Sequence, residues 1–235
     1  MENSRKRNWC LGITFMSAFL LWTMLIQKVD VQPLGVKGTM IGFATLNCWF
    51  HELTGVHMVI YHITDWLGLV PILACMVMGA IGLMQWIKRR SIRKVDYDIL
   101  GLGIYYVVVI AAYLAFEMIP INYRPILIEG RMEVSYPSST TLLVLCVMPT
   151  IIEQAKRRVK NKKVKRWIQS ITMAFSVFMV AGRLICGVHW ITDIIGAIFF
   201  SYGWFRIYKG VVLWYDKTKI KSEVRAWSFM KSFRS

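Results

Sequence analysis

Charged residues are scarce in this sequence, and acidic residues are the scarcest. Only 18% of the 235 residues are charged, and 13 Asp and Glu stand against 29 Lys and Arg, for a formal net charge of +16. Soluble domains carry about 25% charged residues. A soluble nucleic-acid-binding protein could be this basic, but it would not contain several long stretches with almost no charge. The 56% hydrophobic and 14% aromatic content argues against disorder. The composition predicts a multi-pass membrane protein that does not bind nucleic acid.

Paired cysteines are also missing. The five cysteines are widely separated, and none forms a Cys-x-x-Cys pair, so neither a zinc site nor a disulfide framework is expected: Cys10, Cys48, Cys75, Cys146 and Cys186. We find no internal repeat and no low-complexity segment. The chain is therefore interpreted as a single membrane domain, residues 1–235, and no metal or cofactor is expected.

Apolar stretches long enough to cross a bilayer recur along the chain. Crossing takes about 20 predominantly apolar residues in a helix. The stretches predict an all-α, polytopic six-helix transmembrane bundle, followed by a basic tail at 213–235: residues 9–26, 66–87, 98–119, 137–153, 167–187 and 191–212. The first stretch lacks a cleavage site before a polar segment, so we expect a retained helix rather than a signal peptide. Within the long loop 27–65, residues 40–52 predict a short interfacial helix.

The basic residues predict the orientation of the helices. Cytoplasmic loops of membrane proteins collect Lys and Arg. All but five of the 29 basic residues fall in the N-terminus, in the loops after the second and fourth stretches, or from Arg206 onward; the five exceptions are Lys28, Lys37, Arg124, Arg131 and Arg183. Both termini are therefore expected in the cytoplasm, and the protein in the cell membrane.

Several polar residues lie on the predicted outer side, where Lys and Arg are uncommon and their presence needs an explanation. Arg183 lies near the outer end of the fifth stretch and Arg124 follows the third. A charge inside the membrane is a functional hypothesis by default, because burying it is costly. His189 and Asp193 are four residues apart, so a helix would place them on one face. An Asp beside a His suits a nucleophile or general base, and guanidinium groups suit a phosphate.

These residues form three short motifs: Arg124-Pro125, Pro137-Ser138 and Arg183-x5-His189-x3-Asp193. The pattern resembles the signature of the type-2 phosphatidic acid phosphatase superfamily, integral membrane lipid phosphatases related to vanadium haloperoxidases. The resemblance implies an active site at the outer face, with His189 as the nucleophile and Asp193 orienting it. It further implies a phosphate cradle built from Arg124, Arg183, Ser138, Ser139 and Thr140.

The sequence departs from the family pattern at three positions. Glu117 stands where the family has Lys, Gly182 where it has Ser, and Thr140 where it has the His that protonates the leaving group. A hydroxyl does not ionise usefully near neutral pH, so Thr140 cannot replace that His. Glu117 could donate the proton, or it could form a salt bridge to Arg124 or Arg183. An outer-loop histidine is the other candidate, unless all three are ordinary polar loop residues: His51, His57 and His62.

Two functions from different classes remain. The first is a membrane phosphatase that hydrolyses a phosphate monoester or diphosphate of a lipid through a phospho-histidine, with arginines in place of a metal. The second is a catalytically silent lipid-phosphate-binding or interaction protein on the same scaffold. The missing His and Lys favour the second, and the His189–Asp193 pair favours the first. The expected partners are a lipid phosphate substrate and membrane lipids. A lipid transporter rests on the buried arginines alone, and haloperoxidase chemistry belongs to soluble relatives.

Overall fold

The computed structural model describes residues 2–232, with side chains as far as residue 218. Within this part of the chain the structure is helical and contains isolated β-bridges but no strand. The all-α prediction is confirmed. The helices are α1 (Glu2–Ile26), α2 (Ala44–Thr54), α3 (Met58–Leu67), α4 (Leu69–Arg89), α5 (Tyr97–Met118), α6 (Ser139–Arg158), α7 (Lys162–Ile185) and α8 (Ile191–Ser232). Two 3₁₀ turns, Val36–Gly38 and Ile92–Lys94, lie in the connections.

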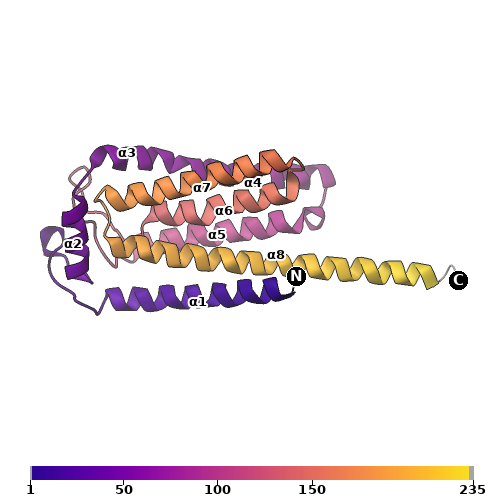
Figure 1. Ribbon diagram of the computed structural model, residues 1–235, viewed down its shortest axis with the longest axis horizontal. Coiled ribbons are helices and arrows are strands. Elements are labelled where there is room, and N and C mark those ends of the chain that lie inside the picture. The colour runs from indigo at the N-terminus through magenta and orange to yellow at the C-terminus, as the bar shows by residue number, and fades with distance from the viewer. Residues whose placement is uncertain (1, 233–235) are drawn as a thin grey trace.

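The long helices run side by side, and α2 lies across one end of the bundle (Figure 1). Helix α1 packs along α8, and α6 packs against both α7 and α8. Glycines allow the closest approach: a Cβ on Gly12 would lie 2.7 Å from Ile207 Cγ1, and one on Gly203 would lie 2.9 Å from the Met16 nitrogen. Small residues at such contacts are the usual means of packing helices in a membrane, where lipid is as apolar as leucine.

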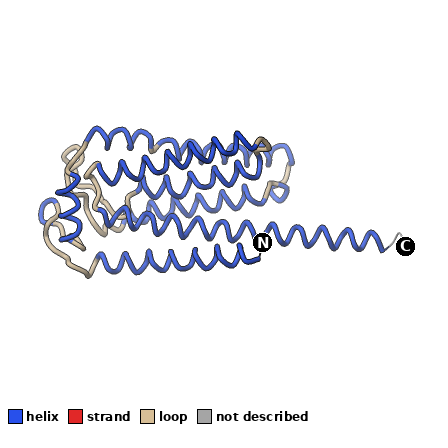
Figure 2. Tube along the Cα trace, in the orientation of Figure 1, coloured by secondary structure: helices blue, strands red, loops and turns tan. Residues whose placement is uncertain are grey.

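Four of the six predicted spans correspond to helices that are long and apolar enough to cross a membrane among the described residues: Glu2–Ile26, Met58–Arg89, Tyr97–Met118 and Lys162–Ile185. The Met58–Arg89 segment combines α3 with α4, so the second span begins earlier than predicted. The other two predicted spans fall on α6 and α8, which are long enough but less apolar than these four. Both run alongside the four in the bundle (Figure 2). The molecule is a multi-pass membrane protein, and the number six remains a prediction.

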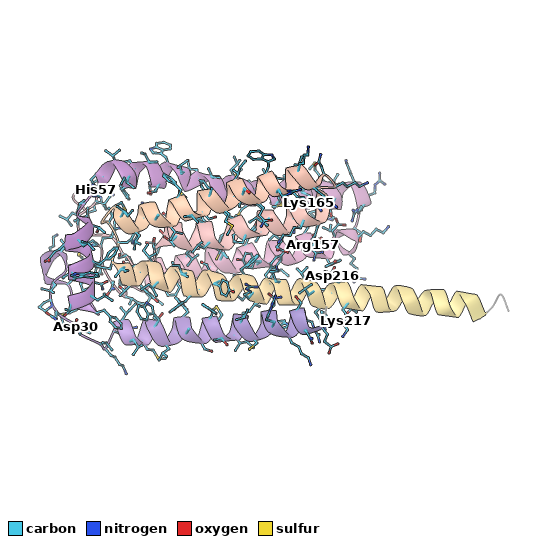
Figure 3. All side chains as sticks on the ribbon, in the orientation of Figure 1. Asp30, His57, Arg157, Lys165, Asp216 and Lys217 are labelled. Carbon is cyan, nitrogen blue, oxygen red and sulfur yellow. The ribbon has the colours of Figure 1, made fainter. Side chains whose placement is uncertain are left out.

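The two ends of the bundle carry different side chains. Asp30 and His57 lie at the end that holds α2, whereas Arg157, Lys165 and Lys217 lie toward the other end (Figure 3). The N-terminal end of α1 and the projecting part of α8 are also at this second end (Figure 1). The predicted basic loops therefore gather at one end, as the orientation argument requires. Which membrane side that end faces remains a prediction.

The loop between α5 and α6 is anchored by Tyr136. Its ring is fully buried, and its hydroxyl lies 2.7 Å from the Thr23 hydroxyl of α1. On the other side the ring lies against Gly196 of α8, where a Cβ would come within 2.5 Å of it. The loop residues next to Tyr136 are thereby fixed against the first turns of α8.

We expect Gly196→Ala to destabilise the protein, because the new methyl group overlaps a buried ring with no room to move. Overpacking of this kind costs about 1–3 kcal/mol, which a lowered melting temperature in detergent would report. Gly79→Ala is the matched control, since nothing lies within 4 Å of a Cβ at Gly79. Equal melting temperatures for the two variants would contradict the tight contact between Tyr136 and α8.

Candidate active site

The motif residues meet at the end of the bundle that holds α2. A hairpin-like loop between α5 and α6 supplies one wall, held by an isolated antiparallel bridge between Tyr123 and Val134. In this loop the Arg124 amide donates to the Glu133 carbonyl at 3.0 Å, and the Ser135 amide donates to the Asn122 carbonyl at 2.8 Å. The turn between α7 and α8 supplies the opposite wall with His189. Backbone hydrogen bonds within the loop thus fix the wall that carries Arg124 and Ser135.

Ser135 lies between the predicted nucleophile and its predicted orienting carboxylate. His189 Nδ1 and Asp193 Oδ2 are 3.8 Å apart, too far for a direct hydrogen bond. Ser135 Oγ lies 3.2 Å from His189 Nδ1 and donates to Asp193 Oδ2. The Trp190 amide donates to the same carboxylate oxygen at 2.9 Å. The serine therefore connects His189 to Asp193. Sequence reasoning missed it, because it belongs to none of the three motifs.

The other ring nitrogen of His189 is left free for chemistry. His189 is 4% exposed, and its Nε2 has no hydrogen-bond partner among the described residues. Burial lowers the pKa of His189 well below its ordinary value, and the nearby guanidinium groups of Arg124 and Arg183 lower it further. The ring is therefore neutral near pH 7, with a proton on one nitrogen and a lone pair on the other.

Both predicted cradle arginines are buried, and each has a carboxylate partner. Arg183 Nη2 donates to Asp65 Oδ1 at 3.1 Å and to Thr140 Oγ1 at 2.5 Å. Arg124 Nη2 lies 3.1 Å from Glu133 Oε2. The Tyr61 ring of α3 lies beside both guanidinium groups, 5.0 Å from Arg183 and 5.8 Å from Arg124, measured to the ring centroid.

Several donors around His189 are buried without a partner in the described part of the chain. A buried donor that lacks an acceptor costs free energy, so each needs an explanation. The donors that lie on the two guanidinium groups near His189 would be satisfied by an anion: Arg124 Nε, Arg124 Nη1 and Arg183 Nε. This donor set, built from guanidinium groups, is suited to phosphate oxygens.

The remaining predicted residues lie around this centre. Ser138 is fully buried; its hydroxyl donates to Thr141 Oγ1 at 3.1 Å rather than capping α6, and its amide donates to the Asp193 carbonyl at 3.3 Å. Thr140 Oγ1 accepts a hydrogen bond from Arg183 Nη2. Ser139 and Glu117 share a very small cavity, about 10 Å³, with Ser135.

Glu117 does not form the salt bridge that was one of its two predicted roles. Its side chain is exposed, and the ion pairs of Arg124 and Arg183 in the described residues are with Glu133 and Asp65. Sequence reasoning missed both of these carboxylates. Glu133 lies in the same loop as Arg124, but Asp65 comes from a helix that was expected to be loop.

The three outer-loop histidines have different surroundings in the structure. His51 of α2 lies with its ring centroid 5.6 Å from that of Trp190, the neighbour of His189. Its helix is held to α8 by hydrogen bonds between Asn47 and Thr192, one of them 3.0 Å long. His57 Nε2 instead lies 2.9 Å from the Thr54 carbonyl, and His62 lies against Tyr61. Of the three, His51 is the one that contacts the sequence neighbour of His189.

A larger cavity reaches the site from the side of the bundle. Its volume is about 490 Å³, and it lies between α4, α5 and α6. Asp65, Ser139 and Thr140 line its polar part, and apolar side chains line the rest, among them Leu69, Ile72, Val109, Ile110, Leu114 and Leu143. Several of these apolar residues are also exposed on the helix surface. The cavity therefore joins an apolar surface between helices to the polar site.

The fold and site define a multi-pass, all-α membrane protein in which two buried arginines lie near a buried histidine. Residues 118–217 match the family model of the PAP2 superfamily, a segment that contains the three motifs but neither Glu117 nor the three outer-loop histidines. The resemblance that the motifs indicate is thereby confirmed.

A solved structure has a similar fold. It is the crystal structure described as the first transmembrane PAP2 type phosphatidylglycerolphosphate phosphatase from Bacillus subtilis. The TM-score is 0.57 at 16% sequence identity, and the similarity covers 85% of this chain and 94% of the other. The search against curated protein sequences returned no match.

Proposed function

We propose that this protein is an integral membrane phosphatase that hydrolyses a phosphate monoester or diphosphate of a lipid. The observation that carries the proposal is that two buried guanidinium groups lie near a neutral His189, and that both they and His189 Nε2 keep atoms without a partner among the described residues. The match to the PAP2 superfamily and the fold shared with a membrane phosphatase support the same reaction class. On the predicted orientation, the site faces the extracytoplasmic side of the cell membrane.

In the proposed mechanism, His189 Nε2 attacks phosphorus and forms a phospho-histidine, which water then hydrolyses. Arg124 and Arg183 hold the phosphate oxygens and stabilise the charge that develops on them, the role that a metal ion has in other phosphatases. The proton on His189 Nδ1 is donated to Ser135, and Ser135 donates to Asp193. This connection fixes the tautomer and supports the positive charge of the histidine as the bond to phosphorus forms. The proposal involves neither a metal nor a cofactor.

The cavity between α4, α5 and α6 supports a lipid as the substrate. A site that takes an amphiphile needs an apolar space for the chain next to a polar space for the headgroup. The cavity supplies apolar side chains from three helices and ends at Ser139 and Thr140, which is where the phosphate would enter. Membrane lipids are therefore the proposed surroundings and the proposed source of the substrate.

The alternative function is a silent lipid-phosphate binder. The observation that favours it is the hydrogen bond between Thr140 and Arg183, because the family's proton-donating His would stand at Thr140. Both functions use the same anion site, so binding alone does not separate them. Formation of a covalent intermediate does.

The experiment that tests the proposal uses the detergent-purified protein without added metal. Phosphate release is measured from phosphatidic acid, phosphatidylglycerophosphate, diacylglycerol pyrophosphate and undecaprenyl diphosphate. A labelled phosphate group is then trapped on the protein by rapid quenching. We expect release from at least one lipid and an acid-labile label on His189. Lipid phosphate binding by folded protein, with neither release nor label, would establish the binder instead.

Ser135→Ala is expected to lower kcat about 10²-fold with little change in KM, because the connection between His189 and Asp193 is lost while the phosphate cradle stays intact. Steady-state kinetics on the best substrate measure the effect. Ser176→Ala is the control, since it removes a part-buried hydroxyl that donates to the Thr172 carbonyl on α7. An unchanged kcat for Ser135→Ala would contradict the role of this serine.

A further inference from the structure

The leaving group of a phosphate ester needs a proton, and the residue expected to give it is replaced by Thr140. An alkoxide is a poor leaving group, and proton transfer by a positioned acid accelerates such steps about 10²–10⁴-fold. In the structure, Thr140 accepts a hydrogen bond from Arg183 Nη2. The same nitrogen donates to the carboxylate of Asp65. Arg183 Nη2 therefore donates both to the carboxylate of Asp65 and to Thr140, the residue at the position of the missing acid.

Helix α3 carries Asp65 to this place because glycine lines the opposite helix. A Cβ on Gly182 would lie 2.6 Å from Thr64 Cγ2, so even alanine would push α3 away from α7. Near the start of α3 the His57 amide donates to the Cys186 carbonyl at 3.0 Å. Two of the three departures from the family pattern, Gly182 and Thr140, thus take part in the contacts that place Asp65. Gly182 lets α3 approach α7, and Thr140 accepts a hydrogen bond from the Arg183 nitrogen that also binds Asp65.

The position of Asp65 relative to the cavities suits a leaving-group acid. Its side chain is 55% exposed and lines the 490 Å³ cavity together with Ser139 and Thr140. A lipid in this cavity would bring its ester oxygen past these three residues. Glu117 instead lines the small cavity beside Ser135, the residue that connects His189 to Asp193. The leaving oxygen departs opposite the attacking nitrogen in an in-line displacement, so the carboxyl on the lipid side is the better placed.

We propose that Asp65 is the general acid for the leaving group, an inference that rests on the proposed phosphatase function. As the bond from His189 Nε2 to phosphorus forms, the phosphorus–oxygen bond breaks and the Asp65 proton passes to the leaving oxygen. The resulting carboxylate then takes a proton from the water that attacks the phospho-histidine, which releases phosphate and restores both side chains.

Asp65→Asn tests this role with two substrates that contain the same diacylglycerol group but differ in their leaving group. The leaving group of phosphatidic acid is a diacylglycerol alkoxide, which needs the proton. The leaving group of diacylglycerol pyrophosphate is phosphatidate, which is already stable as an anion and does not need it. If Asp65 is the acid, kcat on phosphatidic acid falls about 10²-fold or more, and kcat on diacylglycerol pyrophosphate changes much less. Turnover of the second substrate also shows that the variant is folded. Should Asp65→Asn fail to fold, Asp65→Ser is the second variant.

Two other carboxylates provide matched controls. Glu133→Gln removes the partner of Arg124 in place of that of Arg183, and Glu117→Gln removes the acid predicted from the sequence. Neither is expected to change the ratio of the two activities. Equal losses on both substrates in folded Asp65 variants would make Asp65 a mere partner of Arg183 and overturn the inference. A selective loss on phosphatidic acid in Glu117→Gln would assign the proton to Glu117. Wild-type protein that releases no phosphate from either lipid would overturn the proposed function itself.

Discussion

Replacing His189 with Asn is expected to abolish phosphate release, with a loss of about 10³-fold or more. The amide nitrogen of Asn occupies the place of Nδ1, so the hydrogen bond to Ser135 can persist. Nothing then stands in the place of Nε2, which is buried and unpartnered among the described residues. The variant should therefore fold and bind a lipid phosphate, yet form no labelled intermediate. Pulse labelling followed by rapid quenching, together with a melting curve, measures both properties.

His62→Asn is the matched control for this variant. His62 is exposed on α3 and makes its aromatic contact with Tyr61 rather than with the site. It should keep wild-type activity. Substantial release by His189→Asn would mean that the hydrolysis is direct and that the histidine only binds the phosphate.

Arg183→Lys is expected to lower kcat/KM about 10²–10³-fold, the usual cost of removing one preorganised donor from a transition state. The guanidinium group of Arg183 is 1% exposed and already uses Nη2 for Asp65 and Thr140, while Nε remains unpartnered. A lysine ammonium is a single point of charge and cannot hold these partners and a phosphate oxygen in the same fixed geometry. The substitution keeps the charge, so a loss of activity reports the loss of geometry.

Arg131→Lys is the control, because Arg131 is exposed in the loop that carries Arg124. Measurements of kcat/KM and of melting temperature should show a change for Arg183→Lys alone. If Arg183→Lys retained more than half of the wild-type activity, the fork of the guanidinium group would have no part in holding the phosphate.

The helices that the sequence predicts best are those whose apolar residues are uninterrupted. Residues 98–119 were expected to span the membrane, and α5 covers Tyr97–Met118. Helix α3 was missed because His62 and Asp65 interrupt its apolar residues and made the segment resemble a loop. The last helix was expected to end near 212 but continues to Ser232. No Gly or Pro follows Gly210 in that helix, so nothing in the local sequence stops it.

The site could be predicted as far as its motifs extend. Those motifs named His189, Asp193 and the two arginines, which the fold brings to one place. The residues that connect them could not be found in this way. Asp65 contacts Arg183 across 118 positions of the chain, and Ser135 contacts Asp193 across 58. Such pairs arise from helix packing, which depends on contacts like that of Gly182 with Thr64 rather than on any local pattern.

The cavity between α4, α5 and α6 determines which substrate concentration governs the rate of turnover. Because its apolar part reaches the flank of the bundle, a lipid would arrive by diffusing sideways within its own layer, without leaving it for water. The relevant concentration is then the fraction of surrounding lipid molecules that carry the phosphate. Adding inert lipid or detergent at constant bulk substrate should slow turnover by dilution in two dimensions, even though the enzyme and the total substrate remain unchanged.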